Sequence, residues 1–79
     1  MKVYVKTAGF HLDKLTKRQK NGWYELETGE QTEIRDILSK LGVENENGIT
    51  FMLNGNHAEE DAILREADEI LLLRMLYGG

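Results

Sequence analysis

The sequence contains neither cysteine nor proline. Without cysteine, no disulfide or thiolate metal site can reinforce the core, and the chain has no thiol nucleophile of its own. No stretch approaches the roughly 18 apolar residues of a membrane span, and residues 1–5, followed by Lys6, lack the apolar run of a signal peptide. We therefore expect a soluble cytoplasmic protein without a membrane partner, forming one domain over residues 1–79.

Charge is distributed unevenly along the chain. Residues 1–24 carry six cations and one anion, a net charge of +5, whereas residues 25–79 carry four cations and thirteen anions, a net charge of −9. The basic segment Lys14–Lys20 is a candidate nucleic-acid patch, but it offers no aromatic side chain for base stacking and belongs to an acidic domain. We expect a solvated loop there and no nucleic-acid partner, while the acidic remainder suits a basic protein partner.

Few residues offer chemistry of their own. His11 and His57 have neither cysteine nor a paired histidine at metal-ligand spacing, so we expect no metal site. Ser39 has no neighbouring base, and the acidic run Glu59–Asp61 is typical of a solvated face. No glycine-rich phosphate loop is present. The sequence favours a protein that is not an enzyme and binds no cofactor.

The N-terminal third predicts a β-hairpin. Met1–Thr7 has the pattern of a strand with one face toward the core, and Thr16–Gly22 is polar and turn-like. Trp23–Glu27 predicts the second strand of the hairpin. Of Trp23 and Tyr24, we expect one to belong to the core and the other to the sheet surface.

The hydrophobic period then changes from two to 3.6, which predicts an amphipathic helix. Its apolar stripe, at positions i, i+3, i+4 and i+7, consists of Ile34, Ile37, Leu38 and Leu41. Thr32 is placed to act as the N-cap, and Glu33 falls in the first turn, where the helix dipole favours an anion. Gly42 follows the stripe, as a C′ residue in the left-handed conformation should.

Two further strands follow the helix. In Ile49–Asn54, Ile49, Phe51 and Leu53 alternate with Thr50, Met52 and Asn54, which predicts a strand. Ile70–Leu73 is a continuous apolar run of the kind found in a central strand covered on both faces. The connecting segments are a loop at Glu44–Gly48, a turn at Asn54-Gly55, an acidic irregular stretch at Ala58–Ala62, a short apolar anchor at Ile63-Leu64 and a turn at Arg65–Asp68.

This order of elements restricts the packing. The helix must lay its stripe on one sheet face, because two layers are the minimum that bury a core. The most apolar strand belongs at the centre, parallel to the first strand, so that the crossover is right-handed. We therefore predict an α+β fold of the β-grasp (ubiquitin-like) type: a mixed four- to five-stranded sheet with one main helix packed across one face.

The last residues form an apolar and aromatic segment that runs directly into two glycines, Arg74-Met75-Leu76-Tyr77-Gly78-Gly79. From Trp23 onward, the chain resembles the small sulfur carriers of the ThiS/MoaD type and, more distantly, ubiquitin. The segments that carry this resemblance are Thr32–Gly42, Leu53–Gly55, Ala67–Ile70 and Gly78-Gly79.

Three features depart from the family pattern. Ala67 stands where these carriers usually have the glycine of an Asp-Gly-Asp turn, so an alanine occupies a turn position that favours glycine. No proline pair precedes the tail, unlike in molybdopterin synthase small subunits. The basic loop between the first two strands is also longer than that of the thiamine carriers. The departures leave the pathway open.

The resemblance implies that Gly79 is the reactive residue. An adenylyltransferase of the ubiquitin-activating type would use ATP to adenylate its carboxylate, and a sulfur donor would convert it to a thiocarboxylate. This group would donate sulfur in cofactor biosynthesis of the molybdopterin/tungstopterin or thiamine type, with a larger synthase subunit as a further partner. The free carrier is expected to be a monomer. The partner-binding residues would be Arg74, Met75, Leu76, Tyr77 and Gly78.

Two alternatives stay open. A ubiquitin-like protein modifier would use the same activated Gly79 to form isopeptide bonds with lysines. A stand-alone interaction domain would make no use of the Gly78-Gly79 pair.

Overall fold

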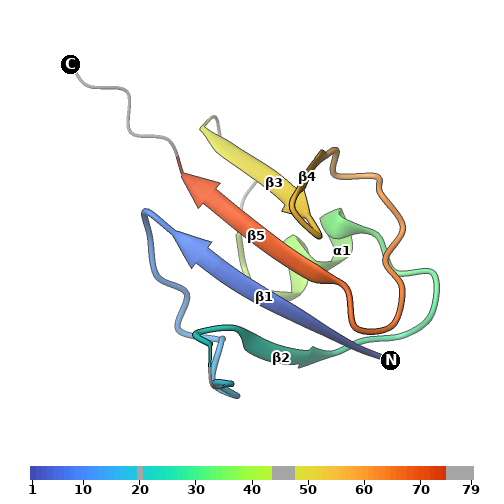
Figure 1. Cartoon of the computed structure of the whole chain (residues 1–79), viewed down its shortest axis with the longest axis horizontal. Helices are drawn as coiled ribbons and strands as arrows, with labels where there is room; N and C mark the ends of the chain where they lie inside the picture. Colours follow the sequence, from blue (N-terminus) through green and yellow to red (C-terminus); the bar gives the residue numbers. More distant parts are fainter. Residues whose placement is uncertain (20, 44–47, 75–79) are drawn as a thin grey trace.

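A mixed five-stranded sheet organises the protein (Figure 1). The structure is a computed structural model that describes residues 1–19, 21–43 and 48–74. Most of the predicted loop at Glu44–Gly48 and the tail residues Met75–Gly79 therefore lie outside the described residues. In chain order, the elements are β1 (Lys2–Ala8), β2 (Tyr24–Glu27), α1 (Ile34–Lys40), β3 (Ile49–Leu53), β4 (Asn56–Ala58) and β5 (Glu69–Arg74).

The strand order is β2-β1-β5-β3-β4. β5 lies at the centre, parallel to β1 and antiparallel to β3, while β2 and β4 form the two edges. The strand with the continuous apolar run is therefore central and parallel to the first strand, as the sequence predicts. The sheet with its one helix confirms the predicted β-grasp fold.

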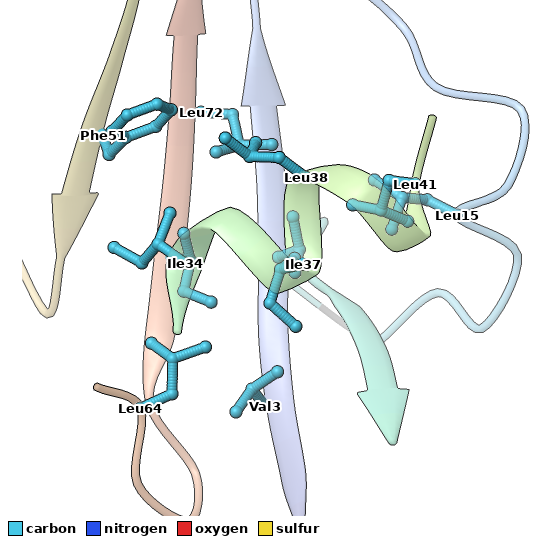
Figure 2. Packing of buried hydrophobic residues seen from close by; sticks show 11 residues of the cluster. Val3, Leu15, Ile34, Ile37, Leu38, Leu41, Phe51, Leu64 and Leu72 are labelled. Carbon is cyan, nitrogen blue, oxygen red and sulfur yellow. The ribbon is translucent and has the colours of Figure 1, made fainter. Parts of the chain in front are cut away.

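The core lies between α1 and one face of the sheet. Val5 pairs with Ile70, and Phe51 pairs with Leu72, so that these four side chains share the face toward the helix. Figure 2 shows the helix stripe directed at this face. The fully buried side chains are Val3, Val5, Ile34, Ile37, Ile70 and Leu72. Burial of each large aliphatic side chain contributes about 1.5–3 kcal/mol before entropy is subtracted.

The helix begins one residue later than predicted. Its N-cap is Glu33, in an extended conformation with φ −96° and ψ 163°, and not Thr32. The backbone N–H of Glu33 donates to Oδ2 of Asp36 at 2.9 Å. Thr32 is buried, and its hydroxyl instead donates to the carbonyl oxygen of Gly29 at 2.6 Å, which makes it part of the preceding loop. Gly42 has φ +73°, the left-handed C′ conformation that the sequence predicts.

The face of β5 that points away from α1 is less buried than the sequence predicts. Ile70 and Leu72 are fully buried, whereas Leu71 and Leu73 are only half-buried. The one helix in the described part of the chain lies behind the sheet in Figure 1, so no helix covers this second face. The expectation that β5 is covered on both faces was wrong, because an apolar run alone does not show how many layers surround it. We call the uncovered side the outer face.

The segment after β3 contains an additional short strand. Asn54 and Gly55 have positive φ angles of 51° and 84°, as in a tight hairpin turn, and β4 follows at once. Ala58, predicted to be irregular, is the last residue of β4 and pairs with Phe51. Of the predicted apolar anchor, only Leu64 is buried, whereas Ile63 is 60% exposed.

Candidate functional site

The predicted functional tail follows Arg74, at the end of the central strand, in the sequence. Arg74 is the last residue of β5 and the last described residue of the chain. Because Ala8 pairs with Leu73 in the parallel ladder, Gly9 comes to lie beside Arg74. We call these two residues, together with Phe10, the tail root.

Gly9 permits a close approach of two backbone segments at the tail root. It has φ +89°, and a Cβ atom at this position would lie 2.7 Å from the carbonyl oxygen of Arg74. Only glycine combines such a φ angle with so little space. The loop after β1 therefore packs directly against Arg74, the last residue of β5 before the tail.

The side chain of Arg74 is held on Phe10. Its Cζ atom lies 5.2 Å from the centroid of the Phe10 ring, within the range of a cation–π contact. Phe10 is itself packed against the hydrophobic core, and Ile49 of β3 pairs with Arg74 from the other side. Arg74, predicted to bind a partner, therefore has its guanidinium group engaged within the domain.

The other predicted site residues cannot be placed. Met75, Leu76, Tyr77, Gly78 and Gly79 all lie outside the described residues. Gly9 and Phe10, on the other hand, were missed as members of the site. A glycine directly after a strand, followed by an aromatic residue, was the signal that could have indicated a tight contact there.

The outer face of the sheet has an apolar centre. Leu71 lies between Lys6 of β1 and Met52 of β3, and Leu73 is the next residue of β5 on this face. These leucine and methionine side chains are half-buried. Leu71 and Leu73 therefore place apolar side chains on the outer face along β5, the strand that ends at Arg74.

The two neighbouring aromatic residues divide as predicted. Tyr24 pairs with Val5 and packs against the core, whereas Trp23 lines a cleft on the outer face with Tyr4. The ammonium of Lys6 lies 5.7 Å from the centroid of the Trp23 ring.

The basic segment is a solvated loop, as predicted for its described part. Lys14, Lys17 and Arg18 are exposed, and the backbone of Arg18 bridges Tyr24 at the free edge of β2. Leu15, which lies within this segment, is buried and anchors the loop to the core.

The remaining candidates do not come together. Nε2 of His11 lies 3.5 Å from a carboxylate oxygen of Asp13, while His57 lies in β4 and Ser39 is exposed on α1. Among the described residues, no group of three or more His, Cys, Asp or Glu side chains is arranged to hold a metal ion. No helix within residues 1–19, 21–43 and 48–74 has the length and apolarity to cross a membrane.

The order β2-β1-β5-β3-β4, with one helix in the described part of the chain packed on one face, is the β-grasp arrangement of small ubiquitin-like proteins. The model of the ThiS family matches residues 14–79. The chain belongs to the ThiS family.

Solved structures support the same fold. SAMP1 from Haloferax volcanii superimposes with a TM-score of 0.72 at 16% sequence identity, over 100% of both chains. Another crystal structure, of H. volcanii small archaeal modifier protein 1, gives a TM-score of 0.69 at 15% identity, over 95% of this chain and 98% of that one. Urm1 from Trypanosoma brucei gives 0.64 at 19% identity, over 99% and 95%. The search of curated proteins found no match.

Proposed function

We propose that this protein is a sulfur carrier that works through the carboxylate of Gly79. The observation that supports this proposal is the extent of the family match, which runs through residue 79 and so includes the Gly78-Gly79 pair. The tail root adds a structural argument. Because Arg74 is fixed by Gly9 and Phe10, the tail begins from a defined point on the domain.

The proposed chemistry has two steps. A carboxylate oxygen of Gly79 attacks the α-phosphorus of ATP on a partner adenylyltransferase, which forms the acyl-adenylate and releases pyrophosphate. A hydrosulfide-equivalent donor then attacks the carbonyl carbon and displaces AMP, which leaves a thiocarboxylate. The carrier itself binds no cofactor in this scheme, and it acts as a cytoplasmic substrate of its partner enzyme.

Each part of the tail has a role in this proposal. Gly78 and Gly79 carry no side chain that would prevent the chain from entering a narrow channel in the partner enzyme. Met75, Leu76 and Tyr77 supply apolar contacts to the partner, of the kind made by an extended peptide in a groove. Leu71, in the half-buried apolar centre of the outer face, lies on β5, the strand whose last residue Arg74 precedes the tail. It would extend the apolar contact of the tail with the partner.

The proposal is tested by the intact mass of the protein. After co-expression with the activating enzyme of its own host, we expect a mass increase that corresponds to exchange of one oxygen for sulfur, localised to Gly79 by fragmentation. Deletion of Gly79 should abolish the increase and leave the thermal melt unchanged. A carrier that keeps full function with an appended C-terminal tag would contradict the proposal and favour the stand-alone interaction domain.

Conjugation to proteins is the second candidate function. It is favoured by the similarity in fold to small archaeal modifier protein 1. The activated carbonyl of Gly79 would then react with a lysine amine instead of a sulfur donor. A pull-down of tagged protein under denaturing conditions distinguishes the two, because only a modifier yields adducts in which Gly79 is joined to lysine.

A further inference from the structure

A cleft on the outer face lies at the opposite end of β5 from the tail root. Its volume is about 340 Å³, and its lining residues are Tyr4, Gln19, Asn21, Trp23 and Glu69. Tyr4 pairs with Glu69 at the first residue of β5, five residues before Arg74 ends the strand (Figure 1). This volume is at the lower end of the range of small-ligand pockets, and it suits one side chain or a small molecule.

The wall of the cleft is a hydrogen-bonded part of the loop that precedes β2. The N–H of Gln19 donates to the carbonyl oxygen of Trp23 at 2.7 Å, and the N–H of Gly22 donates to the carbonyl oxygen of Gln19 at 3.3 Å. The N–H of Glu25 donates to the carbonyl oxygen of Lys17 at 2.8 Å. The loop is thus tied to β2 by backbone hydrogen bonds, which hold Trp23 in the lining of the cleft.

The side chains around the cleft are suited to a cation. Among the described residues that line the cleft, Glu69 is the one with a formal charge, and its carboxylate forms no ion pair with another described residue. Glu25 of β2 pairs with Tyr4, but its carboxylate is already 3.9 Å from the ammonium of Lys2. Glu69 is therefore the carboxylate that the cleft offers to a cation. Two aromatic rings supply electron-rich faces for a cation, and the carbonyl oxygens of the two side-chain amides add hydrogen-bond acceptors.

We propose that this cleft binds the guanidinium group of an arginine on a protein partner. A planar guanidinium stacks on an aromatic ring and at the same time donates two parallel hydrogen bonds to a carboxylate, whereas the ammonium of lysine acts as a point charge. Trp23 and Glu69 offer this combination of ring and carboxylate. The proposal concerns an interaction surface and holds whatever the chemistry of Gly79.

The charge of Lys6 affects how strongly the cleft binds a charged ligand. Its ammonium lies 5.7 Å from the Trp23 ring centroid, which places a resident cation at the rim of the cleft. An incoming guanidinium competes with this ammonium for the indole and is repelled by it. Removal of the Lys6 charge therefore strengthens binding of a cation and weakens binding of an anion, while removal of the Glu69 charge does the reverse.

The test uses the isolated protein and two small probes of nearly the same shape. N-acetylarginine amide carries the guanidinium, and N-acetylcitrulline amide replaces it with a neutral urea. In an NMR titration, we expect the arginine probe to shift the indole N–H of Trp23 and the backbone amides of Tyr4 and Glu69. The citrulline probe should leave them in place.

Three variants complete the experiment. Glu69→Gln should weaken binding of the arginine probe about tenfold, as expected for loss of a charge-assisted hydrogen bond. Glu59→Gln removes the same charge from an exposed position outside the cleft and should leave the affinity unchanged. Lys6→Met should strengthen binding roughly twofold or more. Circular dichroism should show that all three remain folded, since each replaces a side chain of the surface.

The same titrations identify a wrong proposal. Equal shifts with both probes, or no shift of Trp23 with either, would overturn it. Equal affinities for Glu69→Gln and Glu59→Gln would do so as well, because the cleft carboxylate would then have no specific role. Weaker binding of the arginine probe by Lys6→Met would also count against the proposal, because the Lys6 ammonium would then not compete with the guanidinium.

Discussion

The carbonyl oxygen of Arg74 lies 2.7 Å from the point that a Cβ atom on Gly9 would occupy. The two backbone segments are therefore packed at a distance that no side chain at position 9 allows. Gly9→Ala should destabilise the protein by about 2–4 kcal/mol, since it adds this overlap to the cost of a positive φ angle. Urea unfolding followed by tryptophan fluorescence measures the loss.

Two other glycines allow the cost of the overlap with Arg74 to be measured separately from the cost of a positive φ angle. Gly55 has φ +84° with no atom within 4 Å of an added Cβ, and Gly29 has neither a positive φ angle nor a neighbour within that distance. Gly55→Ala should therefore lose only about 1–2 kcal/mol, and Gly29→Ala should be close to neutral. If Gly9→Ala were no worse than Gly55→Ala, the contact with Arg74 would have no energetic weight.

Ala67→Gly should stabilise the protein. Ala67 has φ +67°, a conformation that is unfavourable for a residue with a Cβ atom. The turn around it is fixed by hydrogen bonds from the N–H of Ala67 to the carbonyl oxygen of Lys2 at 2.7 Å and from the N–H of Asp68 to that of Arg65 at 3.1 Å. Relief of the strain exceeds the added chain entropy by about 0.5–1 kcal/mol, which appears as a higher urea midpoint.

Asn54→Gly should have the opposite sign, although Asn54 also has a positive φ angle, of 51°. Its amide nitrogen donates to Oδ1 of Asp68 and its amide oxygen accepts from the N–H of Glu69, both at 2.9 Å. Loss of two hydrogen bonds at about 1 kcal/mol each outweighs the relief of strain. Stabilisation by both substitutions would show that these side-chain bonds contribute nothing.

Much of the fold follows from periodicity in the sequence. Ile34, Ile37 and Leu38 sit at helical spacing and are all buried, and Ile49–Leu53 alternates and forms a strand. The turn at Arg65–Asp68 could be located, and the strained position of Ala67 recognised, because a glycine is usual there in related carriers. Each of these features is visible within a short stretch of sequence, either as a regular spacing of apolar residues or as a set of turn residues.

The missed features depend on particular contacts that hydrophobic periodicity does not show. Thr32 has the side-chain chemistry of an N-cap, yet its hydroxyl donates to the carbonyl oxygen of Gly29 in the preceding loop. β4 has only three residues, Asn56–Ala58, and forms because β3 supplies a partner. The close approach of Gly9 to Arg74 joins residues 65 positions apart, and the local pattern at Gly9-Phe10 does not show which residue lies against it.

Thr32→Val should destabilise the protein although it preserves the shape of the side chain. The Thr32 hydroxyl lies 2.6 Å from the carbonyl oxygen of Gly29 and 2.8 Å from the hydroxyl of Thr28, in a buried position. The substitution leaves these groups without their partner and should cost about 1–3 kcal/mol in the free energy of unfolding. Thr16→Val, at an exposed position, is the matched control and should stay within about 0.5 kcal/mol of the parent.

A substitution in the core face of α1 should abolish folding, whereas a substitution in the tail should abolish only the proposed chemistry. Ile37 is fully buried, so Ile37→Asp places a charge in the core and should unfold a domain whose total stability is about 5–15 kcal/mol. Ser39→Asp adds the same side chain on the exposed side of the helix and should leave the thermal melt nearly unchanged. Gly79→Ala should also melt like the parent but should no longer acquire sulfur, because its methyl group obstructs entry into the activating enzyme. Matched losses of stability in Ile37→Asp and Gly79→Ala would contradict this separation, since the tail would then belong to the folded core.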